Sequence, residues 1–329
     1  MFIHSTIFVS RRIVQSKSRK PPVGLHEFHT KRNQVLIYRN IGGLGDMLMH
    51  RMVFEDFKKL NPEMDIIFAC PPRYFDAVKD HPYIDKLEDS STVNSQDYVV
   101  SYNTTSCCSR YETAVAPLAD KHRSDIWAGH CGVELQNHNM HIKLSQEELD
   151  YGATEIAKLT DQTSVALCPV SAMPSKNLLD HQIEIAVNHL RKKGLFVFSL
   201  HTEPIKSLAK LNVPVLCNRK IREWMGILSA TDYVVSVDTA AFHYAGGTGK
   251  PVVGIFTWAD GYVYGQFYDT KTIVQLHRNT HPDWKCGPCY KWPDCPFTTK
   301  PEKPCLTKIT AQMIENGIDS MLKIYPICN

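Results

Sequence analysis

Short apolar runs alternate with helical segments along most of this chain, and that alternation limits the fold more than any other feature. In the first half, the runs at 34–39, 65–70 and 97–101 read as strands, and 46–60 and 146–159 read as helices. Strands separated by helices form parallel βαβ units, because a parallel pair needs a long crossover connection. The sequence therefore predicts an α/β fold.

A second series of the same kind begins near residue 163. Two successive halves of similar size predict two facing Rossmann-like domains, whose ligands lie at the carboxyl ends of the strands. We expect a domain over 34–162 and another over 163–329. The expected strands are 164–168, 194–200, 213–216, 232–237 and 251–256, and the expected helices are 178–193, 203–211, 221–230, 239–245 and 307–323.

Composition narrows the class of protein. The 329 residues are 43% hydrophobic and 22% charged, which is typical of a soluble globular protein, and no apolar run is long enough to span a membrane. The net positive charge lies in 1–33, where seven Lys and Arg face one acid, Glu27, and we expect this segment to be a disordered extension. Attachment to an anionic surface and an organelle presequence are alternatives. The near-neutral remainder does not suggest a broad nucleic-acid groove.

Eleven cysteines are present, and four of them lie within twenty residues: Cys286, Cys289, Cys295 and Cys305. The other seven are dispersed, which fits a reducing, cytoplasmic compartment with one local thiol site. The spacing C-x₂-C-x₅-C-x₉-C suits tetrahedral metal ligation, with zinc as the generic choice. Disulfides and free thiols remain the alternatives.

Three predicted strands are followed by polar residues that could take part in catalysis or ligand binding. In the first, RNIGGLGDMLMH, a glycine turn ends at Gly45 and Asp46 begins a helix, with His50 one turn later. Glycine permits close approach of a ligand, and a helix start offers free N–H groups. Asp46 is a candidate general base or a simple helix cap. His50 is a candidate acceptor-side residue or a structural histidine.

The second and third strand ends lie in the other half. LCPVSAMPSK places Ser171 and Lys176 in a loop that can hold an anion, although a solvated lysine is the alternative. VDTAAFHYAGGTGKPVVG places Asp238 at the end of a strand, with Thr239, Ala240 and His243 at the start of a helix. A helix N-terminus suits a diphosphate, whereas Asp238 as cap and His243 as a core residue are the structural alternatives.

Together these segments resemble glycosyltransferase family 9, the heptosyltransferases and their relatives. Gly45, Asp46, Met47 and Leu48 match the family's G-D-V-L turn. The D-T-G-x-x-H motif followed by K-P-V-V is matched from Asp238 to Val253, with Ala240 in place of the usual glycine. The resemblance covers about residues 34–325, and its motifs are specific only in combination.

The resemblance implies two facing Rossmann-like domains of the GT-B type, with acceptor on the first and nucleotide-sugar on the second. It implies inverting transfer of a heptose or related sugar from a nucleotide-diphosphate donor, with Asp46 as base and no catalytic divalent ion. The candidates on the acceptor side are Gly45, His50, Arg110 and Arg123. The residues expected to contact the donor are Ser171, Lys176, Glu203, Asp238, Thr239, Ala240 and His243.

For the cysteines, the branch of the family that modifies autotransporters implies iron, so structural iron or zinc is expected, together with a possible homo-oligomer. The acceptor hydroxyl remains open among glycan, protein and modified nucleic acid. The loop 102–127, which contains Arg110 and Arg123, is expected to face it. Two rival interpretations are a catalytically degenerate scaffold and a two-domain nucleotide-sugar epimerase.

Overall fold

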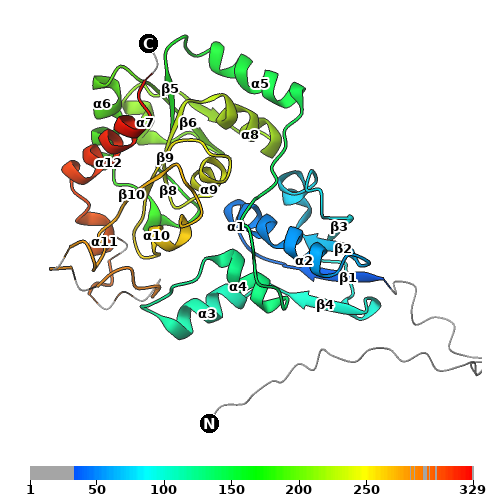
Figure 1. Cartoon of the computed structure of the whole chain (residues 1–329). Helices are drawn as coiled ribbons and strands as arrows, with labels where there is room; N and C mark the ends of the chain where they lie inside the picture. Colours follow the sequence, from blue (N-terminus) through cyan, green and yellow to red (C-terminus); the bar gives the residue numbers. More distant parts are fainter. Residues whose placement is uncertain are drawn as a thin grey trace, which may run out of the picture.

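The computed structural model describes residues 33–327, except 282, 285, 292–294, 296 and 301. Within this part of the chain, two parallel sheets lie in separate lobes that face each other (Figure 1). The predicted α/β class with two facing Rossmann-like units is therefore confirmed. The expected basic extension, 1–33, lies outside the described residues apart from Asn33.

The first lobe holds the four-stranded sheet, whose order is β3-β2-β1-β4. β3 was not expected from the sequence, and the expected helix 46–60 is divided by a 3₁₀ turn at Arg51–Val53. The strands are β1 (Gln34–Tyr38), β2 (Asp65–Cys70), β3 (Lys86–Asp89) and β4 (Val100–Asn103). The helices are α1 (Leu44–His50), α2 (Phe54–Leu60), α3 (Cys107–Val115) and α4 (Arg123–His130).

The second lobe holds the six-stranded sheet, whose order is β10-β9-β8-β5-β6-β7. Its strands are β5 (Ser164–Cys168), β6 (Phe196–His201), β7 (Val215–Cys217), β8 (Tyr233–Val237), β9 (Val252–Ile255) and β10 (Lys271–Val274). Its helices are α5 (Gln146–Ala157), α6 (Asp180–Lys192), α7 (Lys206–Lys210), α8 (Ile221–Ala230), α9 (Ala240–Gly247), α10 (Gly261–Tyr264), α11 (Pro304–Thr307) and α12 (Ala311–Ile324).

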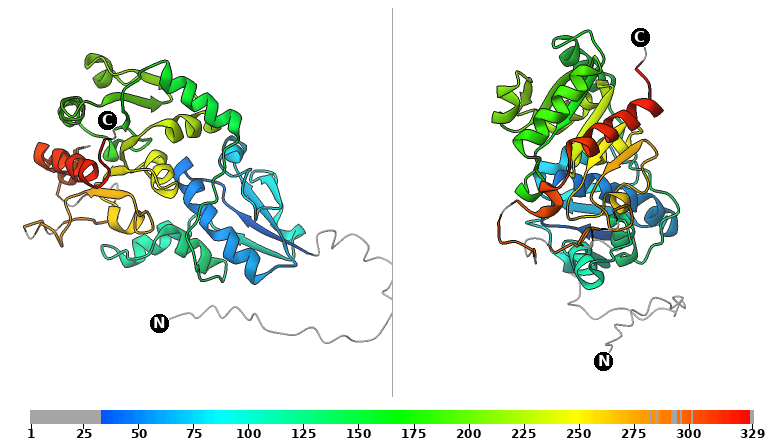
Figure 2. Two further views of the ribbon diagram at one scale, coloured as in Figure 1. Left: turned by 45° about the horizontal axis from the view of Figure 1, so that its top comes forward. Right: turned by 90° about the vertical axis from the view of Figure 1, so that its left-hand side faces the viewer.

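The centre of the second sheet is covered on both faces, so its strands are apolar throughout rather than alternating. Every residue of β5 and β8 is buried. The C-terminal α12 lies along this lobe, where Ile314, Ile318 and Met321 are fully buried (Figure 2). Among the described residues, no helix has the length and apolar character required to cross a membrane.

Two glycines bring α5 and α8 into backbone contact. A Cβ at Gly152 would meet the carbonyl oxygen of Gly226 at 2.0 Å, and a Cβ at Gly226 would meet that of Glu148 at 2.2 Å. Since these neighbours are backbone atoms, the contact cannot be relieved by rotating a side chain. Helix α5 therefore packs on the second lobe, although the expected boundary at residue 162 assigns it to the first domain.

This contact gives a stability prediction. Gly152→Ala is expected to lower the free energy of unfolding by about 2–3 kcal/mol, because overpacking forces the two helices apart. Gly129→Ala in α4 is the matched control, since nothing lies within 4 Å of its added Cβ. The control is expected to be neutral or to stabilise by about 0.5–1 kcal/mol. Urea denaturation checks both, and equal midpoints would contradict the packing described.

The lobes also meet directly at the starts of α1 and α9. A Cβ at Gly45 would lie 3.0 Å from Cδ2 of His243 and 3.4 Å from Cα of Ala240. A side chain at residue 45 would therefore separate two of the sequence-predicted site segments. The fold brings the glycine turn of the first lobe against the helix start of the second (Figure 1).

Candidate active site

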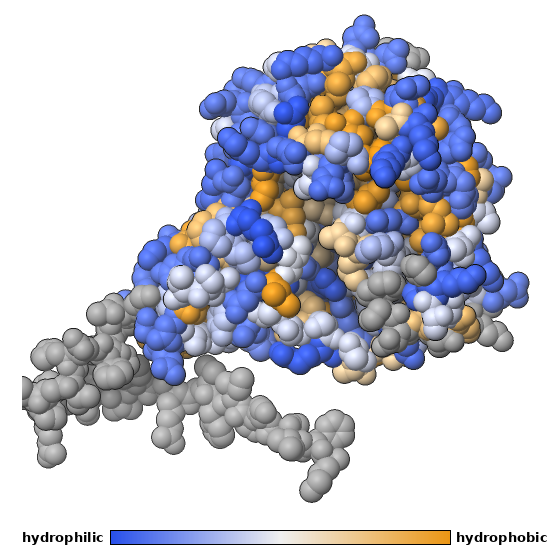
Figure 3. Space-filling view, turned by 180° about the vertical axis from the view of Figure 1, so that it is seen from behind, coloured by the Kyte–Doolittle hydropathy of each residue, from blue (hydrophilic) through white to orange (hydrophobic). Residues whose placement is uncertain are grey.

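A cavity of about 680 Å³ lies where the lobes meet. Its walls come from the start of α1 and from the loops that follow β5, β6, β7 and β8, which are carboxyl ends of parallel strands. Hydrophobic residues gather in the recess between the lobes (Figure 3). The lining includes Gly45, Asp46, Arg123, Ser171, Lys176, Asp238, Thr239, Ala240 and His243.

Asp46 is the third residue of α1, not the first as expected. Its Oδ2 accepts a hydrogen bond from the amide of Gly43 at 3.1 Å, which caps the helix start. Its Oδ1 accepts from Nη1 of Arg123 at 2.8 Å, and Arg39 lies 3.6 Å from Oδ2. Burial opposes ionisation, but the two guanidinium groups outweigh it and lower the pKa of Asp46 to about 2. Asp46 is therefore a carboxylate throughout the neutral range.

A network from both lobes holds Arg123 against Asp46. Glu112 of α3 accepts two hydrogen bonds from Arg123, at 2.8 and 2.9 Å. Tyr264 of α10 donates its hydroxyl hydrogen to Glu112 at 2.7 Å, and its ring lies 4.9 Å below the guanidinium of Arg123. Bidentate pairing fixes a guanidinium in orientation as well as position. Arg123 is thus fixed by residues from both sides of the cavity.

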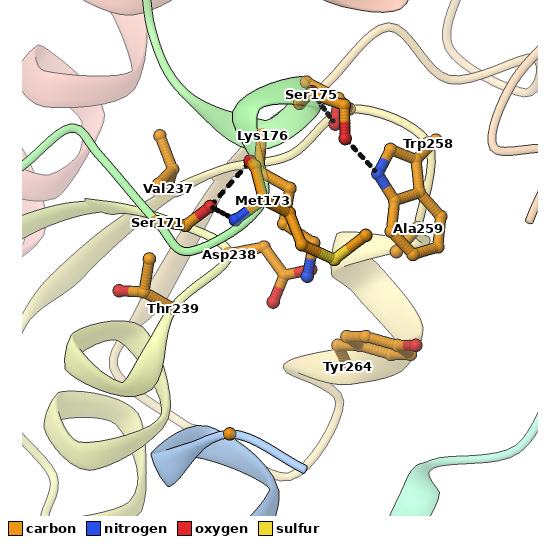
Figure 4. Close-up of polar contacts among 12 residues, drawn as sticks. Ser171, Met173, Ser175, Lys176, Val237, Asp238, Thr239, Trp258, Ala259 and Tyr264 are labelled. Carbon is orange, nitrogen blue, oxygen red and sulfur yellow. Dashed lines mark hydrogen bonds and ion pairs between the residues drawn. The ribbon is translucent and has the colours of Figure 1, made fainter. Parts of the chain in front are cut away.

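On the opposite wall, Lys176 and Asp238 form an ion pair with 2.6 Å between Nζ and Oδ2. His243 lies 3.6 Å from the other oxygen of Asp238 and contacts the hydroxyl of Tyr268 through Nδ1 at 3.0 Å. Burial raises the pKa of Asp238, but Lys176 and then His243 reverse this and lower it well below its usual range. The Lys176 side chain extends between Asp238 and the rings of Trp258 and Tyr264 (Figure 4).

Helix α9 presents its N-terminus to the same space. Thr239 is the cap residue and accepts from the amide of Ala241 at 3.3 Å, so Asp238 is not the cap considered from the sequence. The expected helix 239–245 begins one residue later and extends to Gly247. Asp238 is therefore left for the pair with Lys176.

The loop after β5 is held rigidly beside this ion pair. Ser171 donates its amide to the side chain of Asn177 at 2.7 Å and its hydroxyl to the carbonyl of Met173 at 2.9 Å. Ser175 is buried, and its hydroxyl oxygen accepts from the indole of Trp258 at 3.3 Å (Figure 4). These bonds fix the backbone that carries Lys176 (Figure 4).

Three sequence-predicted residues do not reach the cavity. His50 is fully buried between Phe68 and Trp127, where its Nε2 contacts the hydroxyl of Thr104 at 3.1 Å. The prediction that it binds the acceptor is therefore wrong, because no ligand can contact it. Arg110 is exposed on α3 but does not line the cavity.

Glu203 is also exposed and outside the lining, although its neighbour Thr202 belongs to it. The expected helix 203–211 is shorter, and α7 begins only at Lys206. A donor role for Glu203 stays a prediction, because the structure places it beside the cavity rather than in it.

The sequence prediction missed several residues that line the cavity. An apolar end contains Leu200 and Leu216, near the carboxyl ends of β6 and β7, and Ile221 and Trp224 of α8. Trp258 and Tyr264 follow β9. All lie at or after the carboxyl ends of strands of the parallel sheet, so the rule that ligands lie at carboxyl ends could have identified them. Glu112 does not line the cavity, and no strand end in the sequence pointed to it.

The four clustered cysteines are free thiols, three half-buried and Cys305 buried. Burial first, and then the neighbouring Cys289 and Cys295, raise the pKa of Cys286 to about 11; Cys305 is raised to about 12 in the same way. Within the described residues, however, no group of three or more His, Cys, Asp or Glu side chains is placed to hold a metal ion. Cysteine thiolates are suitable ligands for iron or zinc, but the thiols are not arranged here around one metal position.

Two parallel α/β lobes with a cavity at the strand ends, a carboxylate on one wall and a lysine with a helix start on the other, are the arrangement expected of a GT-B-type glycosyltransferase. The sequence matches the model for glycosyltransferase family 9 (heptosyltransferase) over residues 110–291. The chain belongs to glycosyltransferase family 9, as the sequence motifs predicted.

Solved structures show the same fold. ADP-heptose LPS heptosyltransferase II of E. coli has a TM-score of 0.66 at 13% identity, over 89% of this chain and 99% of that one. A family 9 glycosyl transferase from Veillonella parvula has 0.65 at 12%, over 89% and 98%. The iron-containing dodecameric glycosyltransferase TibC of enterotoxigenic E. coli has 0.68 at 14%, over 90% and 78%. No curated protein matches the sequence.

Proposed function

We propose that this glycosyltransferase moves a heptose or a related sugar from a nucleotide-diphosphate donor to an acceptor hydroxyl placed at Asp46, with inversion at the anomeric carbon. The observation that carries this proposal is the meeting of Asp46 from one lobe with Lys176 and the start of α9 from the other, on a single cavity. The first lobe then binds the acceptor and the second lobe the donor; the sequence-predicted domains, 34–162 and 163–329, match these lobes except that α5 packs on the second.

The donor lies along the second lobe in this account. The apolar end with Leu216 and Trp224 receives the nucleoside base, since ligand sites are mostly apolar with a few placed polar groups. Structures with this fold include E. coli WaaC with ADP and TibC with ADP-D-beta-D-heptose. They support an adenine nucleotide and a heptose as the donor to be tested first.

The leaving diphosphate needs positive charge as the glycosidic bond breaks. Lys176 and the free amides at the start of α9 (Thr239, Ala240) supply it, so no catalytic divalent ion is required. Diphosphate oxygens compete with Asp238 for Nζ of Lys176, now 2.6 Å from that carboxylate. Asp238 and His243 then face the sugar hydroxyls.

The acceptor enters from the first lobe, beside Gly45 and Arg123, which line the cavity. Asp46 removes the proton from the attacking hydroxyl as the new bond forms, a role typically worth about 10²–10⁴ in rate. A glycan, a protein and a modified nucleic acid all offer such a hydroxyl. A homo-oligomer is part of the proposal, since TibC is dodecameric.

Thermal shift with a panel of nucleotide-sugars tests the proposal. The expected result is that ADP-linked sugars raise Tm while the free sugars do not, because a ligand that binds only the folded state stabilises it by mass action. Mass spectrometry of candidate acceptors then identifies the product. If no nucleotide or nucleotide-sugar raised Tm, the degenerate-scaffold interpretation would replace this one.

We further propose that the four cysteines bind one structural iron or zinc ion. Four thiolates leave no open coordination position, so the ion holds the loop and takes no part in the transfer. Binding must displace the thiol protons of the cysteines, because the thiolate is the form that binds a metal. Elemental analysis of reduced protein is expected to find about one ion per chain, and Cys286→Ser to lose it. Reduced protein with neither metal would refute this.

A further inference from the structure

The segment that carries the four clustered cysteines, here called the cysteine loop, is hydrogen-bonded to Trp258, a residue that lines the donor cavity. The backbone amides of Cys289 and Tyr290 both donate to the carbonyl oxygen of Trp258, at 3.0 and 3.1 Å. The side chain of that same tryptophan lines the cavity. The backbone of the cysteine loop is thus bonded directly to a residue of the candidate donor site.

Tyr290 strengthens this contact in two further ways. Its hydroxyl accepts a hydrogen bond from the amide of Asp260 at 3.1 Å. Its ring lies 6.4 Å from the ring of Trp258 and 6.2 Å from that of Tyr264. The side chain is buried, and the backbone has φ of +54°. A non-glycine residue at positive φ is uncommon, so the surrounding contacts must hold Tyr290 in this conformation.

From Trp258 the contacts continue to Lys176. The indole Nε1–H donates to the hydroxyl of Ser175 at 3.3 Å, and Nζ of Lys176 lies 5.2 Å from the centre of the indole ring (Figure 4). A cation over a tryptophan face is attracted by the ring, most strongly where water is excluded. The indole of Trp258 therefore holds both Ser175, the residue before Lys176, and the charged Nζ of Lys176 itself.

We propose that Trp258 is a positioning residue for Lys176 and that Tyr290, at the end of the C-x-x-C segment, holds Trp258 in place. The cysteine loop is then part of the donor site, and its order sets the affinity for a nucleoside diphosphate. This inference rests on the proposed donor role of the cavity. It does not depend on whether a metal, disulfides or packing alone ties the thiols.

The experiment measures the Kd of ADP by calorimetry for four proteins: wild type, Tyr290→Ala, Trp258→Leu and the double variant. Each single change is expected to weaken ADP about tenfold, because an aromatic pair and a hydrogen bond are lost. The double variant is expected to be no weaker than Trp258→Leu, since contacts acting in series are not additive. Phe297→Ala is the control, because Phe297 lies in the same loop but is 64% exposed.

Each result is decisive. If the two losses multiplied in the double variant, or if Tyr290→Ala bound ADP like wild type, the loop would not act through Trp258. An equal loss in Phe297→Ala would show only general loosening of the loop. If Tyr290→Ala failed to fold, Tyr290→Phe removes the hydroxyl alone and is expected to weaken ADP about threefold. Failure of wild type to bind ADP, UDP or GDP would instead overturn the proposed donor site itself.

Discussion

Asp46→Asn is expected to lower kcat by at least about 10²-fold while leaving the Kd of ADP unchanged. Asparagine has nearly the same shape but cannot accept the proton of the attacking hydroxyl. Asp46 lies on the first-lobe wall, across the cavity from Lys176, so the donor contacts remain. Rates of sugar transfer and ADP calorimetry on the same protein separate the two effects.

The pKa of Asp46 determines what this residue contributes to the pH dependence of that rate. The pKa of Asp46 is lowered from 3.8 to about 2 in the folded state. Its ionisation therefore stabilises the fold above about pH 4, and this contribution is lost as the pH falls toward 2. We expect Asp46 to add no acidic limb to kcat/KM between about pH 5 and 8.

Two controls accompany this variant. Asp76→Asn removes a half-buried carboxylate that pairs with Lys79 in the same turn and does not line the cavity, and is expected to leave kcat unchanged. Because Asp46 contributes to stability, Tm of Asp46→Asn must show that it is folded at the assay temperature. Full turnover in a folded Asp46→Asn would remove Asp46 as the base.

Lys176→Met is expected to weaken ADP by about 10- to 100-fold, the loss that follows removal of a charged hydrogen-bond donor. Lys176 is the cation placed between Asp238 and the Trp258 ring, 2.6 Å from the carboxylate. Without it, the diphosphate loses the lysine charge and keeps the amides at the start of α9. Calorimetry with ADP and with adenosine checks the prediction, since adenosine binding should be unaffected.

The change also leaves the buried Asp238 without its lysine partner, although His243 stays 3.6 Å from its other oxygen. Removal of one partner of a buried ion pair destabilises by about 3–5 kcal/mol. The double variant Lys176→Met, Asp238→Asn removes both charges and is the matched control for this effect. It is expected to regain stability but not affinity for the diphosphate. If the double variant bound ADP as wild type does, Lys176 would be a structural partner of Asp238 and not a donor residue.

Local sequence pattern was sufficient to find the parts of the site that sit at strand ends. Asp46, Lys176 and Asp238 each follow a buried strand, and parallel sheets bring such ends to one edge. The family and the fold class followed from the same segments and are confirmed. The roles of the individual residues are set by chemistry that only the experiments above can test.

Burial and long-range contacts were not predictable in this way. His50 lies one turn after Asp46 on α1, yet its direction places it between aromatic rings of the core. The segment 102–127, expected as a loop, contains α3 and the start of α4. Glu112 meets Tyr264 across 152 positions of sequence, a pairing that no local spacing could reveal.

The most direct test of the account is a crystal structure of the protein with ADP. The account predicts the diphosphate between Nζ of Lys176 and the amides at Thr239 and Ala240, with adenine among Leu216, Ile221 and Trp224 and the β-phosphate facing Asp46. A nucleotide bound elsewhere, or turned so that its β-phosphate points away from Asp46, would contradict it.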